Sequence, residues 1–588
     1  MVTKIPDLLS ILKTYYIILY KYGPYNVVWF LLLLVIQALI ETLSILSIYP
    51  FLYAVLNFGD GEGPDTSFRQ YWVQIENIFE NEYALLVATG LFCLFFIIVT
   101  NIYKFLAGYL VNKYCEDLRK NISSGVFHNF LDFDLNEFER ECGEGFVHRA
   151  IVQPDLLVDQ VFRPISFALG ASFSVILVSA SLLAIDPTVI ISLIIPIVFY
   201  YFIIFTISKA SSQNYGKIIE EVGAHRIDFV SESEKGIKGL MLDHRVGFIK
   251  NNFKDALTQF SDAKARYQTI LLVPAFGLET LLFMIAIIGT LFFAQAFSNN
   301  PDEIRSYGSA FGLAVVALYK LKPNVHIVYQ AILALKFGKN AFNKLYSLLI
   351  KFDKHSALKT GKADTLPISI IGEGSFSYQD ITLLENVYLE IKAGQSVAIT
   401  GSSGVGKSTL VDLLLGIRKS PDWKVKWRVQ DTTELLDGSL RGRSAYVPQE
   451  PMLFNGTILT NIALADKINL SVRDISRLRD CLQISGLTSW VESLDQSIYS
   501  LLGRGGIQPS GGQRKRLALA KALYAKPNLL VLDEFTSGLD RQTAETVLTD
   551  VLAYARDKFT LICITHNLEE VVDFEMVLEI KSRNILIK

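Results

Sequence analysis

The sequence is poor in cysteine, and its few cysteines are not paired. Five of the 588 residues are cysteine, and no two of them have the C-x-x-C spacing. Neither a zinc site nor a disulfide framework is therefore expected, and buried free thiols are the simpler interpretation. A cleavable signal peptide is also lacking, because residues 1–22 are basic and apolar without a recognisable cleavage site. The cysteines are Cys93, Cys115, Cys142, Cys481 and Cys563.

Charge is scarce as well, and neither sign dominates. Only 19% of the residues are charged, and the net charge is −2. This balance gives no whole-chain electrostatic reason to expect a nucleic-acid partner. Hydrophobic residues make up 51% of the chain and crowd into its first part, up to about Leu335. The length predicts several domains, and the crowding predicts that one of them lies in a membrane.

Apolar segments long enough to cross a bilayer, which takes roughly 20 residues, occur six times. The connections after the second and fourth segments are rich in Lys and Arg, whereas the connection after the first is acidic. Because positive loops stay in the cytoplasm, both termini are expected there. The expected spans are Asn26–Leu56, Tyr83–Lys113, Phe162–Ile185, Pro187–Ser208, Ile270–Phe297 and Tyr307–Leu335.

The segments that flank the spans also show helical patterns. Leu8–Leu19 predicts an amphipathic helix on the membrane surface before the first span, and Tyr71–Phe79 predicts a short one at the outer interface. The long basic connections keep a helical apolar spacing, which argues against disordered loops. We therefore expect long cytoplasmic helix extensions that reverse near Phe133–Arg140 and Ser233–Leu242, where a soluble domain can make contact.

Several lysines inside the spans require an explanation. A charged side chain in the bilayer costs about 2.5–3.5 kcal/mol on insertion scales. Lys104, Lys320 and Lys322 are candidates for a cavity that holds an anionic substrate. The alternative is that they pair with Glu41 or Glu279, or that their long side chains extend to the interface.

The last part of the chain changes character. Residues 336–366 are charged and less apolar, and from Pro367 to Lys588 strand, turn and helix patterns alternate. The sequence thus predicts a membrane domain over 1–335, a linker over 336–366 and a soluble α/β domain over 367–588.

A phosphate-binding loop stands near the start of the soluble domain. Its sequence, Gly-Ser-Ser-Gly-Val-Gly-Lys-Ser, fits G-x-x-x-x-G-K-[ST] between an apolar strand and a helix. The glycines let backbone N–H groups approach a phosphate, and the helix N-terminus adds a favourable dipole. Lys407 is expected on the β- and γ-phosphates and Ser408 on Mg²⁺. The predicted phosphate-binding residues are Gly401, Ser402, Ser403, Gly404, Val405, Gly406, Lys407, Ser408 and Thr409.

Carboxylates and polar side chains follow other strands of this domain. Asp533 and Glu534 end the apolar strand that starts at Leu529, so Asp533 is expected to hold the metal through water and Glu534 to act as general base. Gln449 follows a strand end and can reach Mg²⁺ and the attacking water. His566 follows the strand Leu561–Thr565 and can bond a γ-phosphate oxygen.

Two further features complete the predicted nucleotide site. Tyr378 ends a strand upstream of the phosphate-binding loop, where its ring can stack on adenine. Ser510, Gly511, Gly512 and Gln513 begin a helix and form a second phosphate-binding N-terminus.

In this combination the chain resembles an ATP-binding cassette (ABC) transporter of the exporter type. The resemblance covers essentially the whole chain and implies a half-transporter: a six-helix transmembrane bundle with long cytoplasmic helix extensions, fused to an α/β P-loop ATPase with an α-helical subdomain. It implies ATP and Mg²⁺ as cofactors and a multi-pass protein of a bacterial inner membrane. In that family Ser510–Gln513 is the signature motif, which completes the ATP site of the opposite subunit, and Ser537–Asp540 is the loop that connects the two sites.

One chain supplies one phosphate-binding loop and one signature motif, so a working pair of sites needs two chains. We expect a homodimer; a heterodimer with a second half-transporter is the alternative, although degenerate partners often lack the base that Glu534 provides. Two positions depart from the family pattern. Pro509 stands where Leu is usual, and Gly503–Gly506 lacks the Glu-Arg pair that many exporters direct to the coupling loops.

Short motifs resemble the lipid-linked oligosaccharide flippases among exporters: Ile40–Thr42 with Pro50–Leu52, Ala317–Pro323, and Gly503–Gly506. The resemblance implies that Lys320 and Lys322 attract the pyrophosphate of a polyprenyl-linked sugar. An exporter of drugs, lipids or peptides is the alternative; the absence of a cysteine-protease domain before the first span makes a leader-cleaving peptide exporter less expected. A membrane ATPase that regulates a partner without moving a solute is a third hypothesis.

Overall fold

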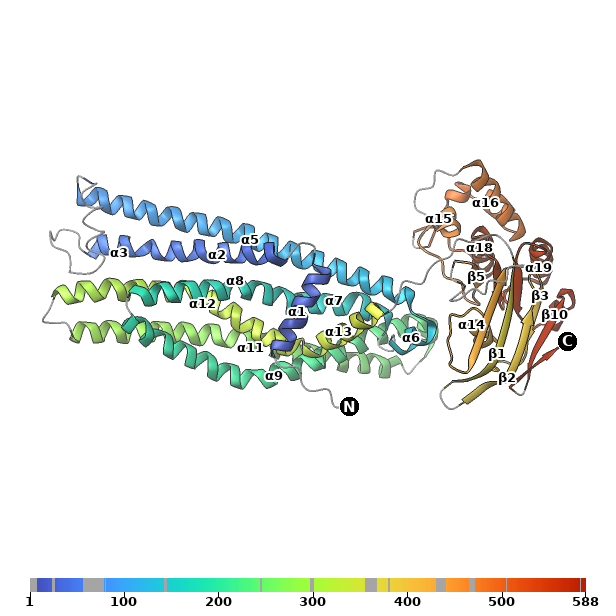
Figure 1. Cartoon of the computed structure of the whole chain (residues 1–588), viewed down its shortest axis with the longest axis horizontal. Helices are drawn as coiled ribbons and strands as arrows, with labels where there is room; N and C mark the ends of the chain where they lie inside the picture. The colour runs from blue at the N-terminus through green and yellow to red at the C-terminus, as the bar shows by residue number, and fades with distance from the viewer. Residues whose placement is uncertain are drawn as a thin grey trace. The chain divides into compact units, whose positions relative to one another are not determined.

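The structure is a computed structural model of the whole chain, and it separates into two compact units (Figure 1). One unit comprises residues 1–131 and 141–354, and the other comprises residues 132–140 and 355–588. The structure describes residues 8–23, 27–56, 79, 81–141, 145–185, 187–243, 246–296, 301–354, 367–378, 381–429, 440, 442–464, 471–503, 505–581 and 583–588. The predicted outer helix over Tyr71–Phe79 falls almost entirely outside these residues, as do Cys142 and Arg504.

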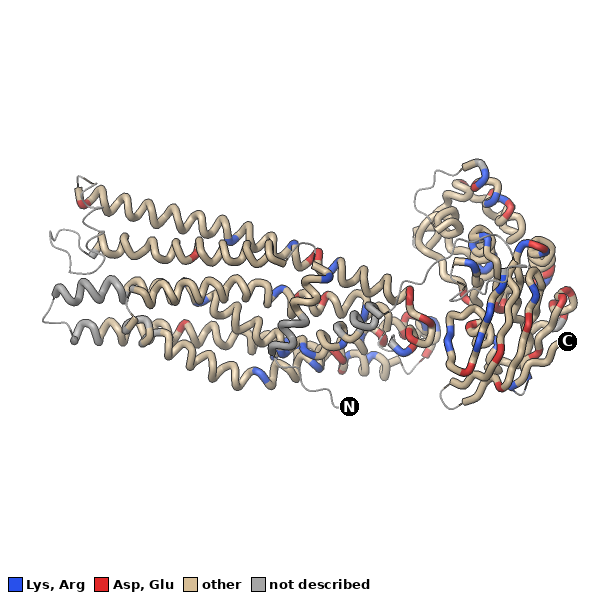
Figure 2. Tube along the Cα trace, viewed as in Figure 1, with Lys and Arg blue, Asp and Glu red and all other residues tan. Residues whose placement is uncertain are grey.

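The first unit is helical and contains the apolar segments. Figure 2 shows that its long helices carry few charged residues over most of their length. Its helices are α1 (Leu8–Tyr22), α2 (Val27–Leu46), α3 (Ile48–Leu56), α5 (Glu82–Asp132), α7 (Gln153–Leu157), α8 (Arg163–Ile185), α9 (Pro187–Lys235), α10 (Ile237–Leu242), α11 (Val246–Ala296), α12 (Pro301–Phe337) and α13 (Lys339–Lys354), with π-helical turns at His148–Val152 and Val158–Phe162.

Helix α1 lies on the bundle through one face, as its amphipathic pattern predicts. Tyr15, Ile18 and Leu19 are buried, whereas Tyr16 and Tyr20 are exposed. The Tyr15 hydroxyl is 3.0 Å from the Ser166 hydroxyl of α8. The buried face therefore packs against the helical unit.

Five helices among the described residues are long and apolar enough to cross a membrane. They begin at Val27, Glu82, His148, Ile194 and Val246, and so coincide with the first five predicted spans. The sixth predicted span, Tyr307–Leu335, lies on α12, which does not meet the same criterion over the described residues. The count of six spans therefore stays a prediction.

Three helices run far beyond the length of one span, as the apolar spacing of the cytoplasmic connections predicts. Helices α5, α9 and α11 have 51, 49 and 51 residues. The chain reverses between them through α6 (Leu135–Glu141) and α10, which match the two predicted reversals. Part of the predicted linker is helical, because its residues 339–354 form the amphipathic helix α13.

The second unit is built on a mixed sheet of order β11-β10-β3-β9-β8-β5. The neighbours from β10 to β5 pair in parallel, and β11 is antiparallel at the edge. An antiparallel sheet of order β2-β1-β4 and a short pair, β6 and β7, complete the strands. Their bounds are β1 (Ile368–Tyr378), β2 (Ile381–Ile391), β3 (Ser396–Thr400), β4 (Trp423–Val429), β5 (Ser444–Val447), β6 (Gly456–Thr457), β7 (Leu501–Leu502), β8 (Leu529–Asp533), β9 (Thr560–Ile564), β10 (Met576–Lys581) and β11 (Asn584–Ile587).

Helices cover this sheet and form two apolar cores with it. Strands β3, β8 and β9 are buried along their whole length, as central parallel strands are when both faces are covered. One core contains residues of α14 and β1, and the other contains residues of α15, α16, α18 and α19. These helices are α14 (Lys407–Leu414), α15 (Ile458–Ala463), α16 (Val472–Ile484), α17 (Thr488–Glu492), α18 (Gly511–Tyr524) and α19 (Arg541–Ala555).

Candidate nucleotide site

The phosphate-binding loop connects the buried strand β3 to helix α14. Gly401, Gly404 and Gly406 have φ angles of 146°, 78° and 104°, which side chains rarely adopt. A Cβ atom on Gly401 would lie 2.8 Å from the carbonyl oxygen of Ile580. The loop therefore requires glycine for its conformation at all three positions and for close packing at Gly401.

Lys407 begins α14 and its amine turns back over the loop. The amine donates to the carbonyls of Gly401 and Ser402, at 3.0 Å each. Its burial lowers the pKa of Lys407, while the nearby Glu534 and Asp533 carboxylates oppose that shift. A buried ammonium that donates to neutral loop carbonyls can exchange them for phosphate oxygens, so the loop fits an anionic ligand.

The predicted base, amide and histidine meet at the ends of three neighbouring strands. Gln449 donates to Glu534 Oε2 at 2.6 Å, and His566 Nε2 is 2.5 Å from Glu534 Oε1. His566 Nε2 is also 3.2 Å from the Lys407 amine. The structure thus brings together residues that lie up to 159 positions apart, and it places Glu534 where it can accept a proton beside the phosphate-binding lysine.

Two residues that the sequence analysis did not identify hold the carboxylates in place. The Tyr446 hydroxyl of β5 donates to Asp533 Oδ2 at 2.6 Å, and burial together with this hydrogen bond raises the Tyr446 pKa. The Lys515 amine of α18 donates to the backbone carbonyls of Glu534 and Ser537 at 2.7 and 2.6 Å. Glu534 has a φ of 44°, an uncommon conformation that the Lys515 contacts help to fix.

The site fits a nucleotide with its metal. Ser408 follows Lys407 in the first turn of α14, and Asp533 is buried at the end of β8; these are the residues that would hold Mg²⁺. Gln449 can supply a third oxygen. When bound, the metal would neutralise phosphate charge; Glu534 would orient and deprotonate the attacking water.

Ser510–Gln513 forms a well-defined helix N-terminus elsewhere in the domain. The Ser510 hydroxyl accepts from the Gln513 N–H at 3.2 Å, and the Gln513 side chain accepts from the Ser510 N–H at 2.8 Å. No hydrogen bond or ion pair of the described residues joins this motif to residues 401–409 of the same chain. Tyr378, at the end of β1, is 49% exposed and its ring is available for stacking.

Residues 132–140 pack with the second unit through a buried arginine that the sequence analysis missed. Arg418 donates to both carboxylate oxygens of Glu139, at 2.7 and 3.1 Å, and to Asn136 Oδ1 at 2.8 Å. Its Nε lies 3.6 Å from Asp412, which stands on the phosphate-binding helix α14. Asn136 donates to the Lys419 carbonyl and Leu135 N–H to the Ile417 carbonyl, at 2.6 and 2.7 Å.

Asp412 should make the stability of this domain pH-dependent. Burial raises the Asp412 pKa from 3.8 to about 6, although Arg418 opposes the shift. The folded chain thus holds this proton more tightly than the unfolded chain. The stabilisation of the fold by the protonated Asp412 is therefore complete below pH about 4 and is lost as the pH rises through 6. Asp412→Asn should therefore lose less thermal stability than the wild type between pH 4.5 and about 7, measured by tryptophan fluorescence; equal losses would contradict this prediction.

The three lysines of the predicted cavity have different partners. Lys104 is 2.5 Å from Glu41 Oε1, and Glu41 is fully buried and also accepts from Asn324 at 3.0 Å. Lys322 is paired with Glu279 of α11. The ion-paired alternative thus describes Lys104 and Lys322. Lys320 instead donates to the Ser44 hydroxyl at 2.7 Å, and within the described part of the chain it has no carboxylate within 4.0 Å.

The sequence carries no local signal for the residues that were missed. Arg418, Lys515 and Tyr446 have partners as many as 282 positions away, and none belongs to a periodic pattern. The two lysines of Ala317–Pro323 stand two positions apart on α12, which places them about 200° apart around the helix. Their partners accordingly lie on different helices, Ser44 on α2 and Glu279 on α11.

Comparisons with known proteins agree with these features. Residues 384–537 match the family model described as ABC transporter. The chain is 24% identical over 505 residues to an export ATP-binding/permease protein of Rickettsia bellii, covering 82% of this chain and 83% of that one. It is 37% identical over 216 residues to ATP-binding cassette sub-family B member 5 of Mus musculus, covering 36% of this chain and 17% of that one.

A solved structure shares the fold. The chain superposes on the ATP-bound structure of a bacterial Atm1-family ABC exporter with a TM-score of 0.70 and 19% sequence identity, over 94% of this chain and 93% of that one. Because the match covers nearly all of both chains, it supports one architecture for the helical and nucleotide-binding parts.

Proposed function

We propose that this chain moves an amphipathic substrate with an anionic head across a bacterial inner membrane, with both chain termini in the cytoplasm. The chain is an exporter-type ABC half-transporter, and its ABC domain couples the hydrolysis of ATP with Mg²⁺ to transport. A lipid-linked oligosaccharide is the substrate that we favour. The observation that carries this choice is the environment of Lys320, an intramembrane cation without a carboxylate partner in the described part of the chain.

The surroundings of Lys320 support a role in binding an anion. Its partner Ser44 is fully buried on α2 and is neutral, so the ammonium charge is not compensated there. One turn earlier on α2, Glu41 joins α2 to α5 through Lys104 and to α12 through Asn324. This network holds α12 in place, while Lys320 retains its charge for a pyrophosphate or a similar anion.

We propose that the transporter works as a homodimer with alternating access. Each complete ATP site would combine the Lys407 loop of one copy with the Ser510–Gln513 helix of the other. Glu534 is present, so both sites of a homodimer can hydrolyse ATP. The short helix α10 has no buried residue, and Met241 and Leu242 are 77% and 84% exposed, which leaves an apolar surface for contact with an ATPase domain of the pair.

Transport into vesicles tests the proposed function directly. The purified protein would be reconstituted in lipid vesicles with a fluorescent lipid-linked oligosaccharide, and movement would be followed with and without ATP. ATP-dependent movement of that lipid supports the proposal. Movement only of drugs or peptides would replace its substrate, and ATP turnover without any movement would favour a regulatory ATPase.

Lys320→Gln should abolish stimulation of ATP hydrolysis by the lipid-linked oligosaccharide and leave basal hydrolysis intact. The substitution removes the uncompensated charge but retains a group that can donate to Ser44. We expect substrate affinity to fall about tenfold or more, since charge-assisted hydrogen bonds contribute about 1.5–3 kcal/mol. Lys322→Gln is the matched control, because Lys322 faces α11 and is paired with Glu279. Unchanged stimulation in Lys320→Gln would remove Lys320 from the substrate site.

A further inference from the structure

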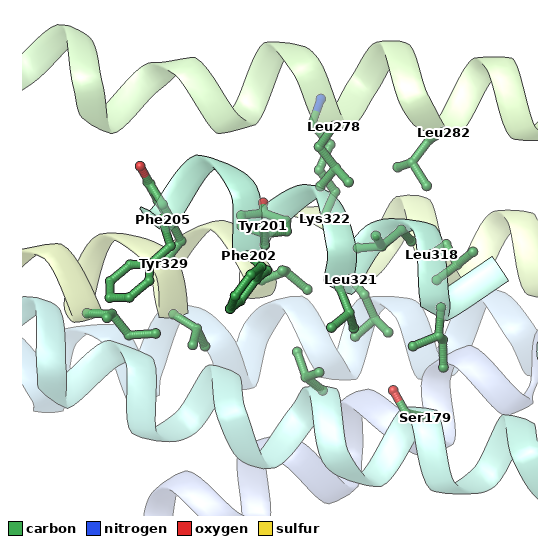
Figure 3. Close-up of a pocket in the computed structure, with 17 residues that line it drawn as sticks. Ser179, Tyr201, Phe202, Phe205, Leu278, Leu282, Leu318, Leu321, Lys322 and Tyr329 are labelled. Carbon is green, nitrogen blue, oxygen red and sulfur yellow. The ribbon is translucent and has the colours of Figure 1, made fainter. Parts of the chain in front are cut away.

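The two units differ in how they use polar side chains. The helical unit contains a cavity of about 390 Å³ between α8, α9, α11 and α12, whose lining residues are aliphatic or aromatic except for Ser179 and Lys322, counting the tyrosines by their rings (Figure 3). Lys322 is paired with Glu279, so these walls add no chemistry to ATP hydrolysis. A denser set of polar contacts surrounds His566 in the nucleotide-binding unit.

The His566 side chain stands at the end of β9 with little packing around it. It is 42% exposed, and its contacts are with Glu534 and Lys407, two groups that a bound nucleotide would itself engage. A side chain that must meet a γ-phosphate oxygen in one place needs support from residues outside the site. For His566 that support has to come through the backbone on either side of it.

The carboxylate of Glu570 holds the chain on both sides of His566. Its Oε2 accepts from the Thr565 hydroxyl at 2.6 Å, and its Oε1 accepts from the Asn567 side-chain amide at 3.2 Å. The same Thr565 hydroxyl accepts from the Asn567 N–H at 3.0 Å. Thr565, Asn567 and Glu570 thus close a ring of hydrogen bonds around the histidine, which we call the histidine clamp.

The histidine clamp is fastened to the rest of the domain at both ends. Thr565 is 2% exposed, and its N–H donates to the Ile399 carbonyl at 3.1 Å. Ile399 lies on β3, the strand that leads into the phosphate-binding loop. At the other end, Asn567 Oδ1 accepts from the Glu569 N–H at 3.1 Å and so caps the 3₁₀-helix that follows. The clamp therefore ties the position of the histidine to the phosphate-binding loop.

The clamp requires a carboxylate, because both of its oxygens accept from a donor. An amide offers one acceptor oxygen and would turn its own N–H₂ toward the second donor. Bonds to a carboxylate are also stronger than bonds between neutral groups. The adjacent Glu569 does not share this task, since its side chain is 67% exposed and pairs with Arg541 of α19 at 3.0 Å.

We propose that Glu570 is a positioning residue for ATP hydrolysis, which holds His566 through Thr565 and Asn567 where the imidazole can bond the γ-phosphate. The inference rests on the role proposed for His566 in the candidate nucleotide site. In the part of the chain that the structure describes, the hydrogen bonds of the Glu570 carboxylate go to Thr565 and Asn567. Glu570 therefore acts on the nucleotide through the histidine.

Nucleotide binding by the purified full-length protein tests this proposal. Affinities for adenylyl-imidodiphosphate and for ADP would be measured with Mg²⁺, because only the first has a γ-phosphate. Glu570→Ala should weaken binding of adenylyl-imidodiphosphate about tenfold, the size of one lost charge-assisted hydrogen bond, and leave ADP affinity unchanged. ATP hydrolysis should fall by a similar factor or more, since small misplacements of reacting groups are costly. Glu570→Gln keeps one acceptor and should lose less.

The double variant with His566→Ala separates positioning from a structural role. In a chain that already lacks the imidazole, Glu570→Ala should cause no further loss, because the clamp has nothing left to position. Glu569→Gln is the matched control and should behave as the wild type, since Glu569 faces Arg541.

Three results would overturn the proposal: an unchanged affinity of Glu570→Ala for adenylyl-imidodiphosphate, an equal loss of ADP affinity, or a further loss in the double variant. If His566→Ala itself binds both nucleotides as the wild type does, the role proposed for His566 fails, and the role of Glu570 fails with it.

Discussion

Glu534→Gln should abolish ATP turnover while the protein still binds ATP. General-base catalysis typically contributes about 10²–10⁴-fold to a rate, so we expect hydrolysis to fall by at least the lower figure. The amide is nearly the same size as the carboxylate, and its oxygen can still accept the hydrogen bond that Gln449 donates to Glu534. The variant therefore loses the proton acceptor without losing the geometry of the strand end.

Two measurements distinguish loss of the base from loss of the site. Phosphate release would be compared with the affinity for a fluorescent ATP analogue, and crosslinking would report whether the two copies stay closed in ATP. Glu545→Gln is the matched control, because Glu545 is a 64% exposed carboxylate that pairs with Arg541 on α19. Near-normal hydrolysis in Glu534→Gln would show that another group accepts the proton.

The position of Glu534 shows why the surrounding residues matter as much as the base. Its φ of 44° is sterically uncommon for a residue with a side chain. The Glu534 N–H donates to the Ile564 carbonyl at 3.0 Å, and Lys515 holds the Glu534 carbonyl at 2.7 Å. The backbone is thus fixed from two sides, and the carboxylate contacts Gln449 and His566.

Local sequence features single out the candidate nucleotide-site residues, whereas they do not single out the partners of the membrane lysines, and the reason is physical. Glycine spacing, strand ends and carboxylates in the ATPase unit are local features, and parallel strands bring their carboxyl ends to one edge. Lys407, Glu534 and His566 could therefore be assigned before their contacts were known. The contact of Lys515 with Glu534 and that of Tyr446 with Asp533 depend on packing between elements, which no local pattern encodes.

The partners of the membrane lysines could not be assigned from the sequence. Sequence distance suggested that Lys320 and Lys322 act together, but a helix sends side chains two positions apart in nearly opposite directions. Their assigned partners, Ser44 and Glu279, lie on different helices, α2 and α11. The sequence does not distinguish a lysine that is paired with a carboxylate from one that is not. The structure is needed to show which intramembrane charge is compensated, because it places the neighbours of each.

Glu139→Gln should uncouple ATP hydrolysis from substrate. Glu139 is the bidentate partner of Arg418, and Arg418 is 7% exposed and also contacts Asp412 of the phosphate-binding helix. The variant leaves the arginine with fewer charge-assisted bonds, so residues 132–140 should be held less firmly. We expect basal hydrolysis to persist and its stimulation by substrate to fall severalfold, measured in vesicles.

Arg418→Met should have a larger effect on stability than Glu139→Gln. Removing one partner of a buried ion pair typically costs about 3–5 kcal/mol, since the remaining charge is left without compensation. Here Asp412 of α14 would remain, with a side chain that is only 18% exposed, while Glu139 is 40% exposed and can be solvated. A double-mutant cycle over Arg418 and Glu139 would give their coupling energy from the unfolding midpoints.

Hydrogen exchange locates the effect within the chain. If Arg418 fastens this segment, exchange at 132–140 should accelerate in both variants, and the Leu135 N–H, which donates to the Ile417 carbonyl at 2.7 Å, should lose protection first. Glu137→Gln on the same short helix is the control, because it leaves the Arg418–Glu139 pair in place. The chain lacks the usual Glu-Arg pair at Gly503–Gly506. For that reason we expect the Arg418 contacts to transmit closure from α14 to residues 132–140. Full stimulation in Glu139→Gln would assign that role elsewhere.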